Sequence, residues 1–203
     1  MIITPQSELE AVNEILSSIG SSPVNSLEDD NNVDVINAKR ILEGVSREIQ
    51  SRGWWFNTLD KVHLDPEIEG YGNSRKYFVP CPNSYIKFTS EGYKLLRREG
   101  YFLDQLSNTM NFPEGLDLDT LVKFLDFQEL PDAFRKYITV RAARIFQMRY
   151  LSATELDQHL QLEESQAYSD LIGYELETGN YNIFDDEDWN TVGTFRGGNT
   201  GWH

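Results

Sequence analysis

Three large aromatic residues, Trp54, Trp55 and Phe56, stand side by side directly after a glycine that ends an amphipathic helical pattern. Neighbours on a helix point about 100° apart, so three in a row cannot all lie on one buried stripe. Each ring can bury roughly 150 to 250 Å². We therefore expect some of them to face another element or another chain, which makes this segment either a core junction of the fold or an assembly surface. An ordinary corner of the core is the plainer interpretation.

Two helical patterns precede this junction. The first, over 7–20, begins with a capping box in which Ser7 accepts a bond from the third amide while Glu10 reaches back, and it stops at Gly20. The second, over about 32–52, stops at Gly53, which fits a left-handed cap. Its apolar stripe repeats every three or four positions and consists of Ile36, Ala38, Ile41, Leu42, Val45 and Ile49.

The helical pattern of the sequence fades between residues 57 and 129. Short aromatic or β-branched runs are separated there by glycine, proline and asparagine, as is typical of strands. The runs are KVHL, KYFV, YIKF, YKLLR, GYFLD and TLVKFLDF. They predict six short strands in a small sheet or barrel, with a long loop over 104–118. The single cysteine, Cys81, has no second cysteine with which to pair, and we interpret it as structural.

Two more helices are predicted after the strands, over about 131–151 and 154–177, and they should form a hairpin. The chain is therefore expected to be α+β in class, with about four helices and a β-rich insertion between the second and the third. Residues 1–56 and 130–177 would form the helical bundle, 57–129 the insertion, and 178–203 an extended acidic tail with glycine and aromatic residues. Such a tail, which includes Trp189 and Trp202, suits docking into a groove of another subunit; terminal disorder is the alternative.

Charges segregate between the last two helices. The third carries only basic charges between 133 and 154, whereas residues 155–195 contain no Lys or Arg. Helices of opposite sign would pair within one chain, and equally well between neighbouring copies in a ring. The candidate interface consists of Arg135, Arg141, Arg144, Arg149, Glu163, Glu164, Asp170, Trp189 and Trp202.

The overall charge restricts the partners. Thirty-three acidic residues against eighteen basic ones give a formal charge of -15, which argues against gripping a nucleic-acid backbone, because that requires clustered Lys and Arg. A negative wall could still line a channel through which DNA passes; solubility is the simpler use of the same charge. No apolar run approaches the ~20 residues of a membrane span, and the start of the chain does not resemble a signal peptide, so we expect a soluble cytoplasmic product and no membrane partner.

The sequence predicts no catalytic, cofactor or metal site. The three histidines, His63, His159 and His203, are isolated from one another and from Cys81. Acidic pairs are plentiful, and a glycosidase needs two carboxylates in a cleft, but the sequence singles out no such pair. A tail-associated glycan hydrolase using paired carboxylates is therefore kept as an alternative.

Several segments occur in an order that resembles one known family. They are ELEAVNEILSSIGSSPVNSLE, NAKRIL, IQSRGWWFN, RREGYFLDQ and LPDAFRKYITVRAARIFQMRY. They are similar to the tail tubular protein A family of T7-like bacteriophages, also called the head-to-tail adaptor or gatekeeper. The family fold, a helical bundle interrupted by a β-rich insertion, agrees with the order of elements expected from the residues.

The resemblance implies a non-enzymatic structural protein of the podovirus virion, assembled in the host cytoplasm. Its subunits would form a dodecameric ring that joins the portal above to the tail nozzle, tubular protein B, below, and genomic DNA would pass through the ring without sequence-specific binding. In this interpretation the basic third helix of one copy faces the acidic fourth helix of the next, and at least one of Trp54 and Trp55 lies in the core beneath the β insertion. A monomeric cytoplasmic binding module is a further alternative.

Overall fold

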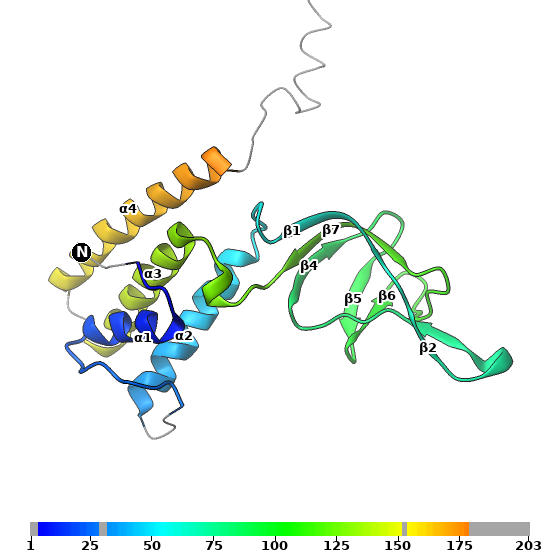
Figure 1. The fold of residues 1–203 in the computed structure, drawn as a ribbon, viewed down its shortest axis with the longest axis horizontal. Helices are drawn as coiled ribbons and strands as arrows, with labels where there is room; N and C mark the ends of the chain where they lie inside the picture. The colour runs from blue at the N-terminus through cyan, green and yellow to red at the C-terminus, as the bar shows by residue number, and fades with distance from the viewer. Residues whose placement is uncertain (1–3, 29–31, 152–153, 179–203) are drawn as a thin grey trace, which may run out of the picture.

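The protein has a helical lobe at one end and a strand-rich lobe at the other (Figure 1). The structure, a computed structural model, describes residues 4–28, 32–151 and 154–178. Within these ranges the helices α1 and α2 come first, seven short strands follow, and α3 and α4 close the described chain. The expected α+β class is confirmed, and so is the position of the β-rich insertion between the second and third helices.

Helix α1 (Glu8–Ser17) begins at the predicted cap. The Ser7 hydroxyl accepts a bond from the Glu10 amide at 3.2 Å. The Glu10 carboxylate reaches back one residue further than a capping box requires and accepts a bond from the Gln6 amide at 2.6 Å. The buried side of the helix consists of Ala11, Val12, Ile15 and Leu16.

Helix α2 (Val33–Gln50) ends as predicted, since Gly53 has the left-handed φ of +82°. Its apolar stripe needs one correction, because Ile36 is 44% exposed and Val35 takes the buried position. Val35 lies three residues before Ala38 and seven before Leu42, whereas Ile36 is turned about 100° away from Val35. Sequence spacing alone could not decide between two adjacent apolar residues.

Helices α3 (Asp132–Tyr150) and α4 (Thr154–Thr178) form the predicted hairpin, with α4 on the outside of the lobe (Figure 1). Pro131 is the N-cap of α3, where its missing amide leaves no helical bond unmade. On α4, Ala167 and Leu171 are fully buried and join the same hydrophobic cluster as α1, α2 and α3.

The strand-rich lobe contains one three-stranded antiparallel sheet in the order β1 (Thr58–Leu64), β7 (Leu116–Lys123), β4 (Tyr85–Thr89). Two antiparallel ribbons accompany it: β2 (Glu67–Glu69) with β3 (Lys76–Phe78), and β5 (Leu95–Arg98) with β6 (Tyr101–Asp104). The described part thus has seven strands in three small sheets, whereas six strands in one sheet or barrel were expected. The extra strand is β2, and a short 3-10 helix, η1 (Gly72–Ser74), lies at its turn.

The last strand begins and ends earlier than the sequence suggested. The expected loop over 104–118 ends at Gly115, because β7 begins with Leu116 and Leu118 buried and the alternating Asp117 and Asp119 exposed. The strand stops at Lys123, and the rest of the TLVKFLDF run returns to the helices. Its last residue, Phe127, begins the short 3-10 helix η2 (Phe127–Glu129) and packs in the helical cluster.

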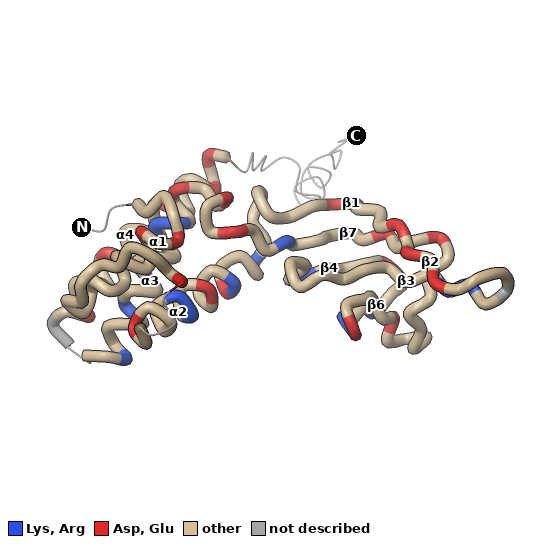
Figure 2. The backbone as a smooth tube through the Cα atoms, turned by 60° about the horizontal axis from the view of Figure 1, so that its bottom comes forward, with Lys and Arg blue, Asp and Glu red and all other residues tan. Residues whose placement is uncertain are grey.

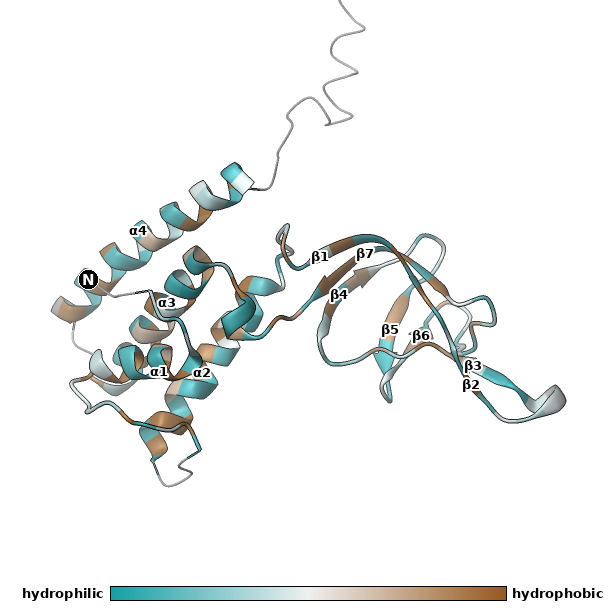
Figure 3. Ribbon diagram, viewed as in Figure 1, coloured by the Kyte–Doolittle hydropathy of each residue, from teal (hydrophilic) through white to brown (hydrophobic). Residues whose placement is uncertain are grey.

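The two lobes have separate hydrophobic clusters, and hydrophobic segments occur in both helices and strands (Figure 3). The cluster of the strand-rich lobe contains Val79, Cys81, Phe102, Phe112, Leu116, Leu118 and Leu121. Cys81 is fully buried, and this burial raises the pKa of its thiol because it disfavours the charged thiolate. Its Sγ accepts a hydrogen bond from Arg97 Nε at 3.4 Å. This is the environment of a structural cysteine. None of the described helices is long and apolar enough to cross a membrane.

Candidate functional site

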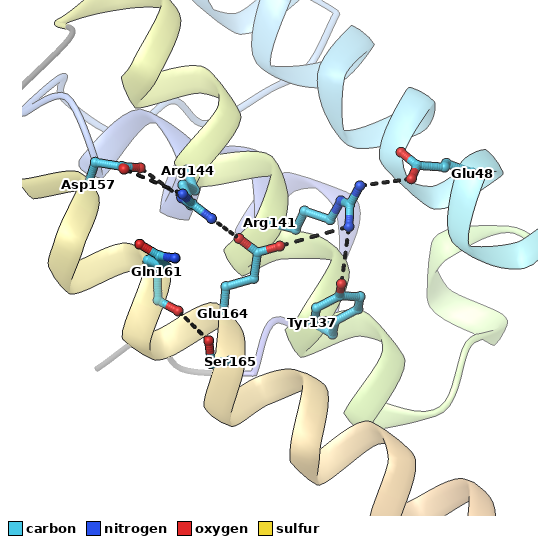
Figure 4. A network of polar contacts seen from close by, with 8 residues as sticks. All are labelled: Glu48, Tyr137, Arg141, Arg144, Asp157, Gln161, Glu164 and Ser165. Atoms are coloured by element: carbon cyan, nitrogen blue, oxygen red, sulfur yellow. Dashed lines mark hydrogen bonds and ion pairs between the residues drawn. The ribbon is translucent and has the colours of Figure 1, made fainter. Parts of the chain in front are cut away.

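The opposite charges of α3 and α4 meet within the chain. Arg144 Nε lies 2.7 Å from Asp157 Oδ1, and its Nη1 lies 2.9 Å from Glu164 Oε2 (Figure 4). The hydrogen bond from Arg144 lowers the pKa of Asp157, and the bonds to Asp157 and Glu164 raise the pKa of Arg144. One arginine thus holds two separate turns of α4 against α3.

Arg141 extends this network to a third helix. Its Nη2 lies 2.7 Å from Glu48 Oε1 on α2, and its Nη1 lies 3.8 Å from Glu164 Oε1 on α4. The same Nη1 donates a hydrogen bond to the Tyr137 hydroxyl at 3.2 Å. Figure 4 shows Glu164 between the two arginines, so this carboxylate is shared.

A further ion pair follows along the hairpin. Lys136 Nζ lies 3.0 Å from Asp170 Oδ2, and this contact lowers the pKa of the Asp170 carboxyl. Of the two arrangements that the sequence allowed, pairing within one chain is therefore the one present for Arg141, Arg144, Glu164 and Asp170. These side chains brace the helical lobe, and the expected pairing of the same residues between copies stays a prediction.

Arg135, another candidate interface residue, is only 8% exposed in the single chain. Its guanidinium pairs with Asp132 one turn earlier on α3. It also donates to the main-chain oxygen and to Oε1 of Gln6, each at 3.1 Å. Arg135 therefore fixes the segment before α1 to α3.

The remaining candidate interface residues have different positions. Arg149 is exposed in the last turn of α3 and has no ion pair among the described residues. Glu163 is half-buried, and its charge adds to burial in raising the pKa of Glu14 on α1. Trp189 and Trp202 lie outside the described residues. Arg149 is thus the one arginine of the proposed set that is exposed and not paired within the described chain.

The three adjacent aromatic residues divide between core and surface. Trp54 is buried and packs edge-on against Phe134 of α3, with ring centroids 4.8 Å apart, and its indole N–H donates to the Ile49 main-chain oxygen at 2.7 Å. Phe56 approaches the same Phe134 ring at 4.6 Å. Trp55 is 46% exposed. The buried rings belong to the helical cluster, at the point where the chain leaves it for the first strand.

Two buried amides hold the connection between the lobes, and no sequence pattern indicated them. Gln50 forms a reciprocal pair with Leu125: its Nε2 donates to the Leu125 oxygen at 3.0 Å, and its Oε1 accepts from the Leu125 amide at 2.8 Å. Asn57 Nδ2 donates to the main-chain oxygens of Gln50 at 3.0 Å and Lys123 at 2.9 Å. The segment that leaves the helical lobe at Asn57 and the segment that returns to it at Lys123 and Leu125 are therefore both bonded to the end of α2.

In the strand-rich lobe, the His63 side chain lies close to two carboxylates. His63 Nδ1 lies 2.6 Å from Asp117 Oδ1, and its Nε2 lies 3.6 Å from Asp65 Oδ1. The hydrogen bond to Asp117 raises the pKa of His63. In the described part of the chain, no group of three or more His, Cys, Asp or Glu side chains is placed to hold a metal ion.

Polar side chains with specific geometry in this molecule join helix to helix and lobe to lobe. The comparison with protein families identifies the class: residues 9–181 match the family model described as tail tubular protein. The chain therefore belongs to the tail tubular protein family. It is a structural component of the phage tail, and thus of the virion, that assembles with other tail proteins, and this membership indicates a non-enzymatic role. The comparison with curated proteins finds no match to this chain.

Proposed function

We propose that this protein is the ring-forming adaptor of a T7-like podovirus tail. Copies of the chain, twelve by the family resemblance, close side by side beneath the portal and join it to the nozzle, tubular protein B. Genomic DNA passes through the centre during ejection, and the ring assembles in the host cytoplasm. The observation that carries this proposal is the match of residues 9–181 to the tail tubular protein family, in a chain that forms two lobes (Figure 1).

The bracing of the helical lobe supports this role. Arg141 and Arg144 connect α2, α3 and α4, so the lobe behaves as one rigid unit that a ring can repeat. The strand-rich lobe has its own cluster and lies at the other end of the molecule, which supports a contact with a second partner. We propose that 1–56 with 130–177 forms the ring-building unit, that 57–129 faces the nozzle or a neighbour, and that 178–203 is an extended docking tail.

The charge supports passage of DNA without retention. Acidic positions recur along β1 and β2, while Lys and Arg are spread over both lobes (Figure 2). Four of the basic residues, including Arg141 and Arg144, are already paired with carboxylates of the same chain. A net charge of -15 repels phosphates and does not replace their counterions.

The test is reconstitution with the portal. Purified protein is mixed with portal rings and imaged by electron microscopy, with portal alone as the control. The expected result is an added annulus on one face of the portal, with a mass increase that is a whole multiple of the 23.4 kDa chain. Protein that leaves the portal unchanged and remains monomeric over a range of salt concentrations would contradict the adaptor role.

A further inference from the structure

A groove of about 560 Å³ runs between α2 and α3 on the surface of the helical lobe. Its apolar lining comes from Ile41 and Val45 of α2 and Ile145 of α3. Both helices are fixed on either side of it. The Asn37 amide donates to the Tyr150 hydroxyl at 2.7 Å, and Glu48 pairs with Arg141 at 2.7 Å. The groove is therefore held open by contacts that belong to the fold.

The sides of the groove are positively charged. Arg40 of α2 and Arg149 of α3 both line it, both are exposed, and neither has an ion pair among the described residues. This separates them from Arg141 and Arg144, whose charges are matched within the chain. An occupant of this groove would combine apolar side chains with acidic ones.

Gly44 lines the groove from the interior of α2, and the fold of a single chain does not explain it. Glycine destabilises a helix interior relative to alanine. A Cβ atom added at Gly44 would meet nothing within 4 Å, so no neighbour in the described chain requires the missing side chain. Close approach of a backbone from another molecule is a reason for glycine at this position.

The outer face of α4 has matching properties. Leu162 and Leu176 are 70% and 63% exposed and lie on the same side of the helix. Between them on this side stand Ser165, Ser169 and Gly173, four residues apart, and a Cβ at Gly173 would likewise meet nothing within 4 Å. We call these five residues the outer face of α4.

The charge of α4 complements that of the groove. No Lys or Arg occurs in the sequence from Thr154 to Thr178. On this helix Asp170 is paired with Lys136 of α3 and Glu163 is half-buried, whereas Glu177 beside Leu176 is exposed. The outer face thus presents leucines and small residues for close contact, on a helix whose charged side chains other than histidine are all acidic.

We propose that the outer face of α4 in one copy of this chain packs into the α2–α3 groove of the next copy. Gly44 and Gly173 then permit close helix crossing, and the negative charge of α4, with the exposed Glu177, is attracted to Arg40 and Arg149. The two surfaces share no residue, so the contact is head-to-tail and repeats from copy to copy until the ring closes. This inference rests on the proposed adaptor function and names the surfaces that build its ring.

The first test fills the contact without disturbing the monomer. Gly44→Leu and Gly173→Leu each add a side chain to open space, so the melting temperature of the isolated chain is expected to stay the same or to rise. Ring formation on the portal should weaken roughly ten- to hundredfold, as overpacking of a close contact does. Gln161→Leu, at an exposed position of α4 about 100° from Leu162, is the matched control and should assemble normally.

The second test detects the contact directly. A variant with both Gly44→Cys and Gly173→Cys, oxidised in assembled rings, should give a ladder of covalent multimers on a denaturing gel. Each single-cysteine variant should give no ladder, because a head-to-tail contact needs both surfaces and the native Cys81 is fully buried. Gly44→Cys with Gln161→Cys is the control pair and should also give no ladder.

The outcomes separate this inference from the function on which it rests. If the leucine variants form rings as the wild type does and the cysteine pair forms no ladder, the assigned contact is wrong and the adaptor role stands. If rings persist but bind portal poorly, the outer face meets the portal and the inference is overturned. If removal of residues 179–203 alone abolishes the effect of Gly44→Leu, that segment occupies the groove and the inference is likewise overturned. Wild-type protein that never forms rings overturns both proposals.

Discussion

Two neighbouring tryptophans show that residue type alone does not decide whether a side chain is buried. Trp54 is buried against Phe134 and donates its indole N–H to Ile49, while Trp55 is 46% exposed and meets Phe56 edge-on at 6.0 Å. The sequence indicated that the three aromatics could not share one stripe. It could not indicate which ring turns inward, because that depends on the direction in which Gly53 ends the helix.

Replacing each tryptophan by alanine tests this division. Trp54→Ala should lower the free energy of unfolding by roughly 3 to 5 kcal/mol, since it leaves a cavity beside Phe134. Trp55→Ala is the control and should cost about 1 kcal/mol, the value of an aromatic pair at the surface. Urea unfolding followed by circular dichroism measures both. Equal losses for the two variants would show that Trp54 does not anchor the helical cluster.

At the scale of whole elements, the helices were predictable and the strands only partly so. The apolar repeats and caps of α1 and α2 fixed their extents to within a few residues, because Ser7 and Gly53 mark the ends chemically. Strand β2 was missed because it is only three residues long, contains the single apolar residue Ile68 between Glu67 and Glu69, and buries none of them. It exists through its pairing with β3, which no local pattern records.

The pairing of α3 with α4 illustrates the same limit for the candidate site. Charge segregation indicated that the two helices attract each other, but opposite charges pair equally well within and between chains. The closeness of the two helices in sequence and the hydrophobic residues Ala167 and Leu171 favour pairing within the same chain. Gln50 and Asn57 gave no signal at all, since a buried amide has no sequence pattern.

Reversing the charge of Arg144 tests the role of this pairing in the hairpin. Arg144→Glu places a third carboxylate beside Asp157 and Glu164 and should lower the melting temperature by at least about 4 °C. Adding Asp157→Arg should restore part of the loss. Arg149→Glu, one residue before the end of α3 and at a side chain without an ion pair among the described residues, is the control for melting. It should cost about 0.5 kcal/mol, because it only opposes the helix dipole. A melting temperature unaffected by Arg144→Glu would contradict the bracing role.

At the scale of the whole molecule, the two lobes depend on one narrow connection. The chain leaves the helical lobe after Trp54 and returns through Lys123 and Leu125, and the buried amides of Gln50 and Asn57 join these segments. Because each lobe has its own hydrophobic cluster, these bonds rather than a shared core determine how firmly one lobe is held against the other. A ring that must present one set of surfaces to the portal and another to the nozzle needs a fixed angle between the two lobes.

Gln50→Ala should loosen this connection. The Leu125 amide and carbonyl would lose their partners at a buried site, at a cost of roughly 1 to 3 kcal/mol. We expect the wild type to melt in one calorimetric transition and the variant in two, because the lobes no longer unfold together. Gln128→Ala, at an exposed position of η2 close to the same connection, is the matched control and should melt as the wild type does. A single transition in Gln50→Ala, with an unchanged radius of gyration in solution scattering, would show that other contacts couple the lobes. The angle between the lobes would then have to be fixed by the hydrophobic packing of Trp54 and Phe127 at the base of the helical lobe.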